Sequence, residues 1–224
     1  YQRRVRGMFV LASNSPRRKE LLERNYKQFI VMSSPFDEDT IISDDPKILC
    51  QQKASKKGEA VFSVIMLPTI SCDTVVSYNG RIYEKPKNQS EASQFMKDFS
   101  NNKVTIYSAA SIFVKELDQK QLNTVLTKIQ SCSCLTNQKI EETQNFIEIS
   151  FIGHCDIFFG HIGEMEIENY TNTQEPYDKA GGFGVQSIAA KWIESIHGDY
   201  YSVVGMPYSA VCSILDVILE GQKQ

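Results

Sequence analysis

The sequence has few of the residues on which several common catalytic mechanisms depend. Its 224 residues include only three histidines, which disfavours a mechanism that uses histidine as acid or base. It contains no G-x-S-x-G segment, the motif that presents the nucleophile of α/β-hydrolases. Candidate catalytic groups are therefore carboxylates, assisted by lysines and arginines.

Cysteine is also scarce and scattered. Six cysteines are too few for a disulfide scaffold at this length, so we expect a reducing compartment; they are Cys50, Cys72, Cys132, Cys134, Cys155 and Cys212. Cys132 and Cys134 do not keep zinc-site spacing with His154 and His161, so no zinc site is expected.

The sequence lacks both a long apolar run and an excess of positive charge. No apolar stretch approaches the roughly 20 residues that span a bilayer, so we expect no membrane span. The net charge is −3, whereas non-specific nucleic-acid binders are usually basic, so we expect no direct nucleic-acid binding. No secretory signal is visible, which favours a cytoplasmic location. Arg3, Arg4 and Arg6 leave a mitochondrial transit peptide as the alternative, with a solvated tail as the simpler explanation.

Strand and helix patterns alternate along most of the chain. Ser15 followed by Pro16 is a typical helix start, and Asn79-Gly80 between two β-rich runs predicts a tight hairpin turn. The periodicity predicts other strands at 8–12, 103–114, 146–159 and 199–207. It predicts other helices at 46–62, 90–99, 163–172 and 209–220. These elements predict an α/β or α+β fold with a mixed central sheet.

Residues 116–145 interrupt this pattern. The segment is rich in Gln, Asn, Lys and Thr and poor in large apolar residues, so it reads as an insertion. We expect a partly disordered loop or a peripheral hairpin outside the core. The rest of the chain shows no internal repeat, and residues 1–224 are expected to form one domain. The insertion is also a candidate surface for a protein partner.

Two arginines stand where a helix normally carries acids. Arg17 and Arg18 lie in the first turn after Ser15, at the positive end of the helix dipole, where a cation is disfavoured. An anion held between them would reverse this penalty, because guanidinium groups match phosphate oxygens in pairs. Ser13 would add a hydroxyl donor. The alternative is that both arginines face water or pair with Glu20 and Glu23.

Carboxylates in two places suit water activation or metal binding. Asp73 lies in a β-rich run, where aspartate is disfavoured and costly to bury without a partner. The alternative is that Asp73 caps a local turn, with Thr74 as its hydrogen-bond partner. Glu38 belongs to the acidic segment "DEDT", which could be a solvated loop or a Mg²⁺ ligand.

Lysines follow in three further segments. One face of the predicted helix at 46–62 can carry Lys53 and Lys56 together, and Lys85 is fixed beside a proline. Asp178 and Lys179 precede three glycines in four residues, which would allow close approach of the backbone to a ligand. This run has neither the spacing of a dinucleotide-binding motif nor that of a Walker loop. Together these residues suit metal-assisted attack of water on a phosphoanhydride.

Three segments in order, "LASNSPRRKELL", "SCDTVVSYNGRIYEKPK" and "EPYDKAGGFGVQSIAAKWIESIHGDYYSVVGMP", resemble the Maf family of nucleoside triphosphate pyrophosphatases. The resemblance covers residues 8–219 apart from the segment 116–145. It implies two α/β lobes around a cleft, as in the inosine triphosphate pyrophosphatases. It also implies hydrolysis of a nucleoside triphosphate to the monophosphate and pyrophosphate, a divalent metal (Mg²⁺ or Mn²⁺), and often a homodimer.

The resemblance also assigns roles to residues of this chain. Asp73 matches the aspartate that accepts a proton from water, and Glu38 matches the acidic residue near the metal, with help from Asp73 or Asp178. The phosphate contacts match Ser13, Arg18, Lys53 and Lys85, and Lys179 is expected to join them. Three positions that distinguish substrate subgroups match Arg17, Thr74 and Gln186. This combination resembles the branch that acts on dTTP and UTP.

The chain departs from the family pattern in two short stretches. Residues 101–104 lack a histidine common in the family, and an arginine common before the acidic helix is replaced near Gly160. These departures permit an alternative, in which the protein keeps the fold as a non-catalytic scaffold or assembly subunit. A nucleotide sensor that binds without turnover is a third possibility.

Overall fold

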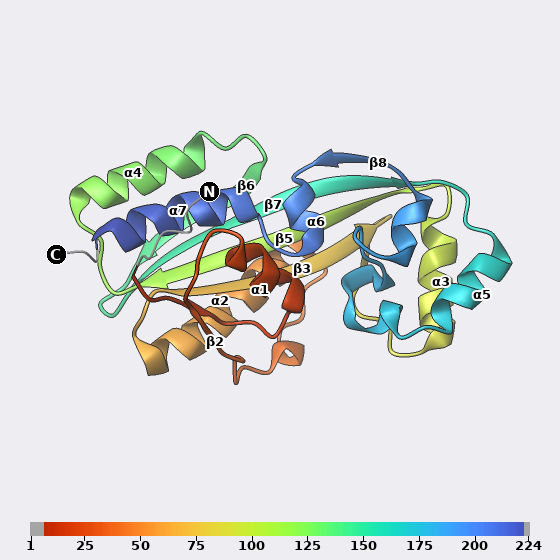
Figure 1. Cartoon of the computed structure of the whole chain (residues 1–224), viewed down its shortest axis with the longest axis horizontal. Coiled ribbons are helices and arrows are strands. Elements are labelled where there is room, and N and C mark those ends of the chain that lie inside the picture. The colour runs from red at the N-terminus through yellow and green to blue at the C-terminus, as the bar shows by residue number, and fades with distance from the viewer. Residues whose placement is uncertain (1–6, 222–224) are drawn as a thin grey trace.

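The computed structural model describes residues 7–221, so Arg3, Arg4 and Arg6 lie outside the described residues. Its centre is a mixed sheet in which three long antiparallel strands run the length of the molecule (Figure 1); these are β3 (Thr69–Tyr78), β5 (Lys103–Val114) and β7 (Ile147–Phe159). At one edge, β1 (Val10–Leu11) pairs in parallel with both β2 (Ile30–Val31) and β3. β4 (Arg81–Tyr83) pairs with β3, while β6 (Leu135–Glu142) and β8 (Ile193–Gly198) both pair with β7.

Helices divide the molecule into two lobes along these strands (Figure 1). The first lobe carries α1 (Pro16–Glu23), α2 (Pro46–Ile65), α4 (Gln119–Gln130) and α7 (Tyr208–Gly221). The second carries α3 (Gln89–Phe99), α5 (Glu164–Thr171) and the 3₁₀ turns η2 (Glu175–Asp178), η3 (Ala180–Gly182) and η4 (Ile188–Trp192). The turn η1 (Glu38–Thr40) and the short helix α6 (Tyr200–Val204) complete the chain. The predicted mixed α/β fold is confirmed.

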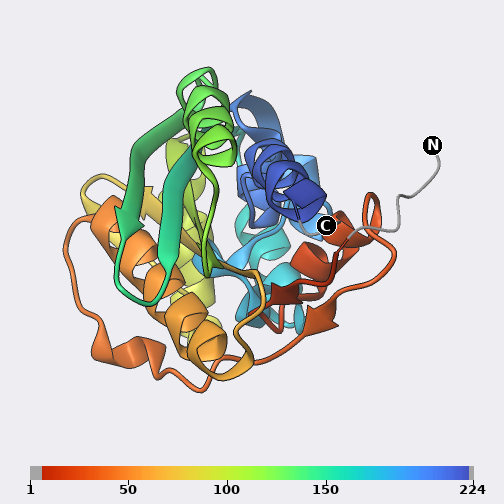
Figure 2. The same ribbon diagram turned by 90° about the vertical axis from the view of Figure 1, so that its left-hand side faces the viewer.

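The two faces of the sheet bury different helices in the first lobe. α2 packs on one face, where Cys50 and Ala54 share a core with Ala109 and Ile152. α7 packs on the other, within a larger core that also contains residues of α1 and α4. Figure 2 shows α2 and α7 on opposite sides of the strands. Successive residues of a strand point to opposite faces, so β3 presents alternate side chains to each layer.

The hairpin around Asn79-Gly80 forms as predicted. Asn79 and Gly80 both have positive φ, 49° and 76°, which a type I′ turn requires at both central residues. The predicted strand at 103–114 coincides with β5. α3 begins one residue before its predicted start, because Asn88 caps it by accepting from the N–H of Glu91.

The segment 116–145 is neither a disordered loop nor outside the core, so those expectations were wrong, although its strand does form a hairpin with β7 at the edge of the sheet. It forms α4, opened by a capping box between Asp118 and Gln121, and then β6. Val125 and Ile129 of α4 and Leu135 of β6 are buried in the same core as α7. A helix needs only a narrow apolar stripe to pack, and the segment's polar composition concealed that stripe.

The predicted strand at 199–207 was also wrong. Asp199 instead caps α6 by accepting from the N–H of Tyr201, and Gly205 with a φ of 124° ends the helix. One turn of helix gives too short an apolar pattern to distinguish it from a buried strand. Among the helices of residues 7–221, none has the length and apolar character needed to cross a membrane.

Candidate functional site

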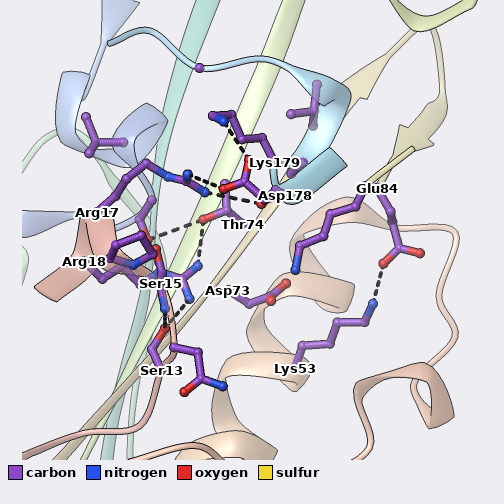
Figure 3. A pocket seen from close by; sticks show the side chains of 18 of the residues that line it. Ser13, Ser15, Arg17, Arg18, Lys53, Asp73, Thr74, Glu84, Asp178 and Lys179 are labelled. Carbon is purple, nitrogen blue, oxygen red and sulfur yellow. Dashed lines mark hydrogen bonds and ion pairs between the residues drawn. The ribbon is translucent and has the colours of Figure 1, made fainter. Parts of the chain in front are cut away.

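A cleft of about 930 Å³ lies between the two lobes, next to the middle of β3. Figure 3 shows its charged side chains, with Arg17 and Arg18 on one side of Asp73 and the Lys53–Glu84 pair on the other. Of the residues that the sequence suggested for a site, Lys56 lies outside the cleft, and the others line it: Ser13, Arg17, Arg18, Glu38, Lys53, Asp73, Thr74, Lys85, Asp178, Lys179 and Gln186. The fold thus brings together segments up to about 170 residues apart in the chain.

Arg18 is the best-anchored cation of the cleft. Its guanidinium donates to the Gly205 carbonyl at 2.7 Å, to Ser13 Oγ at 3.1 Å and to Thr74 Oγ1 at 3.2 Å. These contacts join the start of α1, strand β3 and the end of α6. A planar guanidinium can serve several acceptors at fixed angles, which explains why arginine stands here.

Arg17 crosses the cleft to the other lobe. Its Nη1 donates to Asp178 Oδ2 at 2.9 Å, and its Nη2 reaches the Asp178 carbonyl at 3.4 Å. The alternative pairing of the arginines with Glu20 and Glu23 is wrong in the structure, because Glu23 pairs with Lys19 instead. Both first-turn cations therefore face the cleft.

The start of α1 adds backbone donors beside these arginines. Ser15 occupies the N-cap with extended backbone, and its N–H donates to Ser13 Oγ at 3.2 Å. Pro16 follows at the first helical position, where its missing N–H is not needed. Because the first turn holds no acid, its positive dipole and the two guanidinium groups act in the same direction on an anion.

Asp73 lies inside β3 rather than at a strand edge, opposite Ala109 of β5. Its residue surface is only 9% exposed, and Lys57 Nζ donates to its Oδ1 at 2.8 Å. Burial raises the pKa of Asp73, while Lys57 and Arg18 act against that shift. The result is a carboxylate that is more basic than usual and faces the cleft.

Glu38 is linked to Asp73 by the ammonium of Lys57, which contacts both carboxylates. Lys57 Nζ also donates to Glu38 Oε2 at 2.8 Å, so one ammonium joins η1 of the acidic loop to strand β3. Partial burial acts to raise the pKa of Glu38, but Lys57 outweighs it and the pKa is lowered. Glu38 is therefore held as a charged carboxylate at the mouth of the site.

The second lysine of α2 that faces the cleft is Lys57, so the expectation that Lys56 accompanies Lys53 was wrong. Lys53 and Lys57, four residues apart, both face the cleft, whereas Lys56 is exposed and pairs with Glu59 at 2.8 Å. Lys53 forms an ion pair with Glu84 of the second lobe. Spacings of three and four residues both fit one helix face, so the pattern alone could not select Lys57 over Lys56.

Thr74 is not the hydrogen-bond partner of Asp73 in a local turn. Its hydroxyl lies 3.0 Å from Ser108 Oγ and accepts from Arg18, so the alternative of an Asp73 cap is wrong. Lys85 and Gln186 are exposed at the cleft wall. Within residues 7–221, no hydrogen bond or ion pair engages the Lys85 side chain, which leaves its ammonium available to a ligand.

The glycine run positions the loop of Asp178 and Lys179 by close packing. Gly181 has a φ of 67°, and a Cβ there would lie 2.9 Å from Val76 Cγ2 of β3. Lys179 Nζ donates to the Glu175 carbonyl at 2.8 Å and to Asp178 Oδ1 at 2.6 Å. The small residues therefore seat this segment against β3, and two cations cover the Asp178 carboxylate.

The carboxylates differ in how well they suit a divalent cation. Glu38 and Asp73 converge on one cation position, and Mg²⁺ is commonly held by one or two carboxylates plus substrate phosphates. Burial acts to raise the pKa of Asp178, but hydrogen bonds from Lys179 and Arg17 lower it overall. Residues 7–221 hold no group of three or more His, Cys, Asp or Glu side chains able to bind a metal. The pair Glu38 and Asp73 fits a metal completed by phosphate oxygens, whereas the role of Asp178 as a ligand stays a prediction.

The two departures from the family pattern lie next to each other and outside the cleft. The N–H of Asn101 donates to the Gly160 carbonyl at 3.0 Å, and the N–H of Phe159 donates to the Asn102 carbonyl at 3.0 Å. Neither the segment 101–104 nor Gly160 lines the cleft. The replaced residues therefore leave its walls intact.

The fold and this cleft define an α/β protein with a cation-lined site between two lobes. Residues 8–144 and 120–218 match the Maf family, described as Maf-like protein, and the chain belongs to that family. Among similar proteins is the dTTP/UTP pyrophosphatase of Clostridium novyi (strain NT), 35% identical over 208 residues, which are 92% of this chain and 94% of that protein. The dTTP/UTP pyrophosphatase of Latilactobacillus sakei subsp. sakei (strain 23K) is 32% identical over 211 residues, 93% of this chain and 99% of that protein.

Proposed function

We propose that the protein hydrolyses nucleoside triphosphates, dTTP and UTP foremost, to the monophosphate and pyrophosphate. The observation that carries this proposal is the position of Asp73, a buried carboxylate between the arginines of α1 and the lysines of α2 and of the loop after β4. The relatives named dTTP/UTP pyrophosphatase, similar over more than nine-tenths of the chain, supply the substrate class.

Cations on different walls of the cleft are placed to contact different parts of the triphosphate. The start of α1 offers N–H groups and the Arg18 guanidinium to phosphate oxygens. Lys53, Lys85 and Lys179 stand on the other walls, where they offset the charge that develops on the leaving pyrophosphate. Arg17, Thr74 and Gln186 are the residues through which we expect the base to be selected.

Asp73 accepts the proton of the attacking water in this proposal. Burial raises its pKa, which makes it a stronger base than an exposed aspartate. Asp73 pairs with Ala109 of β5 within a continuous ladder along β3, so the carboxylate is held on a rigid element. Water attack at the α-phosphorus then releases pyrophosphate.

A divalent cation fits beside Glu38 and Asp73, as their shared cation position indicates. When bound, it would neutralise phosphate oxygens and polarise the bond to be cleaved. Glu38 would hold it from the solvent-facing side of the site, since its side chain is 44% exposed, and Asp73 would hold it from the sheet. We propose Mg²⁺ or Mn²⁺ on the chemistry of these oxygen donors.

A pyrophosphate-release assay on a panel of nucleoside triphosphates tests the proposed function. We expect dTTP and UTP to yield the monophosphate and pyrophosphate in the presence of Mg²⁺. The matched control is Asp73→Asn, which keeps the size of the side chain and removes its basicity. Binding of dTTP without turnover in the unmodified protein would instead support a sensor or scaffold.

A homodimer, a cytoplasmic location and a partner at α4–β6 are additional parts of the proposal. The family resemblance supports the homodimer, and the scarcity of cysteine supports a reducing compartment. Exposed Leu126 on α4 leaves an apolar position on the segment 116–145 for a partner. Light scattering coupled to size-exclusion chromatography tests the dimer.

A further inference from the structure

Lys57 is, with Lys53, one of two almost fully buried lysines that line the cleft, and no role described above requires it. Its side chain is 8% exposed, and its Nζ lies 2.8 Å from both Asp73 Oδ1 and Glu38 Oε2. Asp73 and Glu38 come from different segments and are brought to one point by this ammonium. A buried cation in contact with two carboxylates is a strong electrostatic neighbour for both.

The position of this ammonium coincides with the oxygens that a divalent cation would use. Mg²⁺ binds carboxylate oxygens at about 2.1 Å, and both candidate oxygens here already accept a hydrogen bond from Lys57. An ammonium and a divalent ion cannot share one pair of oxygens at such distances without strong repulsion. The two cations must therefore compete.

We infer that Lys57 is a built-in competitor for the divalent metal, whose ammonium occupies the cation position between Asp73 and Glu38 in the nucleotide-free protein. Metal binding in the absence of nucleotide is weak as a consequence. This inference rests on the proposed function only in taking Asp73 and Glu38 as the metal-binding pair. The lysine also keeps Asp73 paired when no metal is bound, which spares the sheet an uncompensated buried charge.

The test is a Mn²⁺ titration of the nucleotide-free protein, read by electron paramagnetic resonance of the free ion. Lys57→Met is expected to bind Mn²⁺ at least tenfold more tightly than the unmodified protein. Lys56→Met is the matched control, because Lys56 lies on the same helix, pairs with Glu59 and is exposed. It changes the net charge equally, and its Mn²⁺ affinity is expected to stay within twofold. Equal affinities for Lys57→Met and the unmodified protein would overturn the inference.

Loss of Lys57 also leaves Asp73 buried without its ion pair, so a second variant and a second measurement are needed. Lys57→Gln keeps a hydrogen-bond donor without the charge and is expected to tighten Mn²⁺ binding in the same direction. A ligand that binds the folded state raises the melting temperature, so weak Mn²⁺ binding should give only a small rise. We therefore expect Mn²⁺ to raise the melting temperature of the unmodified protein no more than that of Asp73→Asn. A rise in the unmodified protein that Asp73→Asn lacks would contradict the inference.

These measurements do not involve turnover. A protein without pyrophosphatase activity in which Lys57→Met still tightens Mn²⁺ binding would refute the proposed function alone. An active enzyme in which Lys57→Met leaves Mn²⁺ binding unchanged would refute the competition alone.

Discussion

Among the described residues, the sheet buries two carboxylates, Asp73 in the cleft and Glu148 near the start of β7, and their surroundings differ. Asp73 on β3 is 9% exposed and Glu148 on β7 is 8% exposed, and burial raises the pKa of each. Asp73 receives an ammonium at 2.8 Å, whereas Glu148 receives the Ser55 hydroxyl at 3.0 Å. The carboxylates of Glu141 and Glu59 raise the Glu148 pKa further, and Lys56, whose charge also interacts with Glu148, forms its ion pair with Glu59.

Helix α2 supplies both partners, from residues two positions apart. Lys57 faces the cleft and Ser55 faces Glu148. Burial of an acid is therefore not what distinguishes the proposed active site in this protein. The distinguishing feature is the convergence of cations from both lobes on Asp73, which a phosphate chain could occupy.

Turnover should show the largest contrast between these two acids. Asp73→Asn is expected to lower kcat by about 10²–10⁴-fold, the usual contribution of a positioned general base. Glu148→Gln changes a similarly buried carboxyl group that does not line the cleft and is expected to leave kcat within twofold. Pyrophosphate release from dTTP measures both. Similar losses of kcat in the two variants would indicate that Asp73 supports the folded structure and takes no direct part in the reaction.

Arg18→Lys tests whether the guanidinium geometry matters beyond its charge. A lysine cannot span the Gly205 carbonyl, Ser13 and Thr74 together, and each charged hydrogen bond contributes about 1.5–3 kcal/mol. We expect kcat/KM for dTTP to fall about 10–100-fold. Arg24→Lys, an exposed change outside the cleft, is the control and is expected to stay within twofold. Unchanged kinetics for Arg18→Lys would indicate that only the positive charge of Arg18, and not its guanidinium geometry, matters for the reaction.

The sequence predicted the strongly patterned parts of the fold because local chemistry determines them. Asn79-Gly80 requires positive φ, and the apolar run 103–114 can only be buried as a strand. The segment 116–145 was misjudged because α4 buries only a thin stripe that includes Val125 and Ile129. Propensity and composition carry little information where packing against α7 decides the structure.

The residues of the proposed site could be named from the sequence, but their pairing could not. Arg17 was recognised as an unusual cation, yet its partner Asp178 lies 161 residues away and no local pattern joins them. Lys57 was missed for a related reason. The choice between it and Lys56 depends on the angle at which α2 crosses β3, which is a tertiary property.

The smallest expected effect is on stability: Glu148→Gln is expected to be more stable than the unmodified protein. A raised pKa means that the folded protein holds a proton on Glu148 at pH values where the unfolded chain has released it. The free energy of unfolding then falls as pH rises from the usual Glu pKa of about 4.3 through the raised value. The amide introduced by Glu148→Gln does not titrate, so the variant's free energy of unfolding does not show this fall with rising pH.

Urea unfolding of Glu148→Gln and the unmodified protein at several pH values measures this difference. At neutral pH we expect the variant to be more stable by about 1 kcal/mol, because it buries no charge. The difference should shrink below pH 4, where both forms are neutral at this position. Glu168→Gln, on an exposed side chain of α5 that is not among the charges acting on the Glu148 pKa, is the control and is expected to show little change. A loss of stability in Glu148→Gln at neutral pH would mean that the Ser55 contact outweighs the cost of burying the charge, and the two carboxylates would then differ less than their partners indicate.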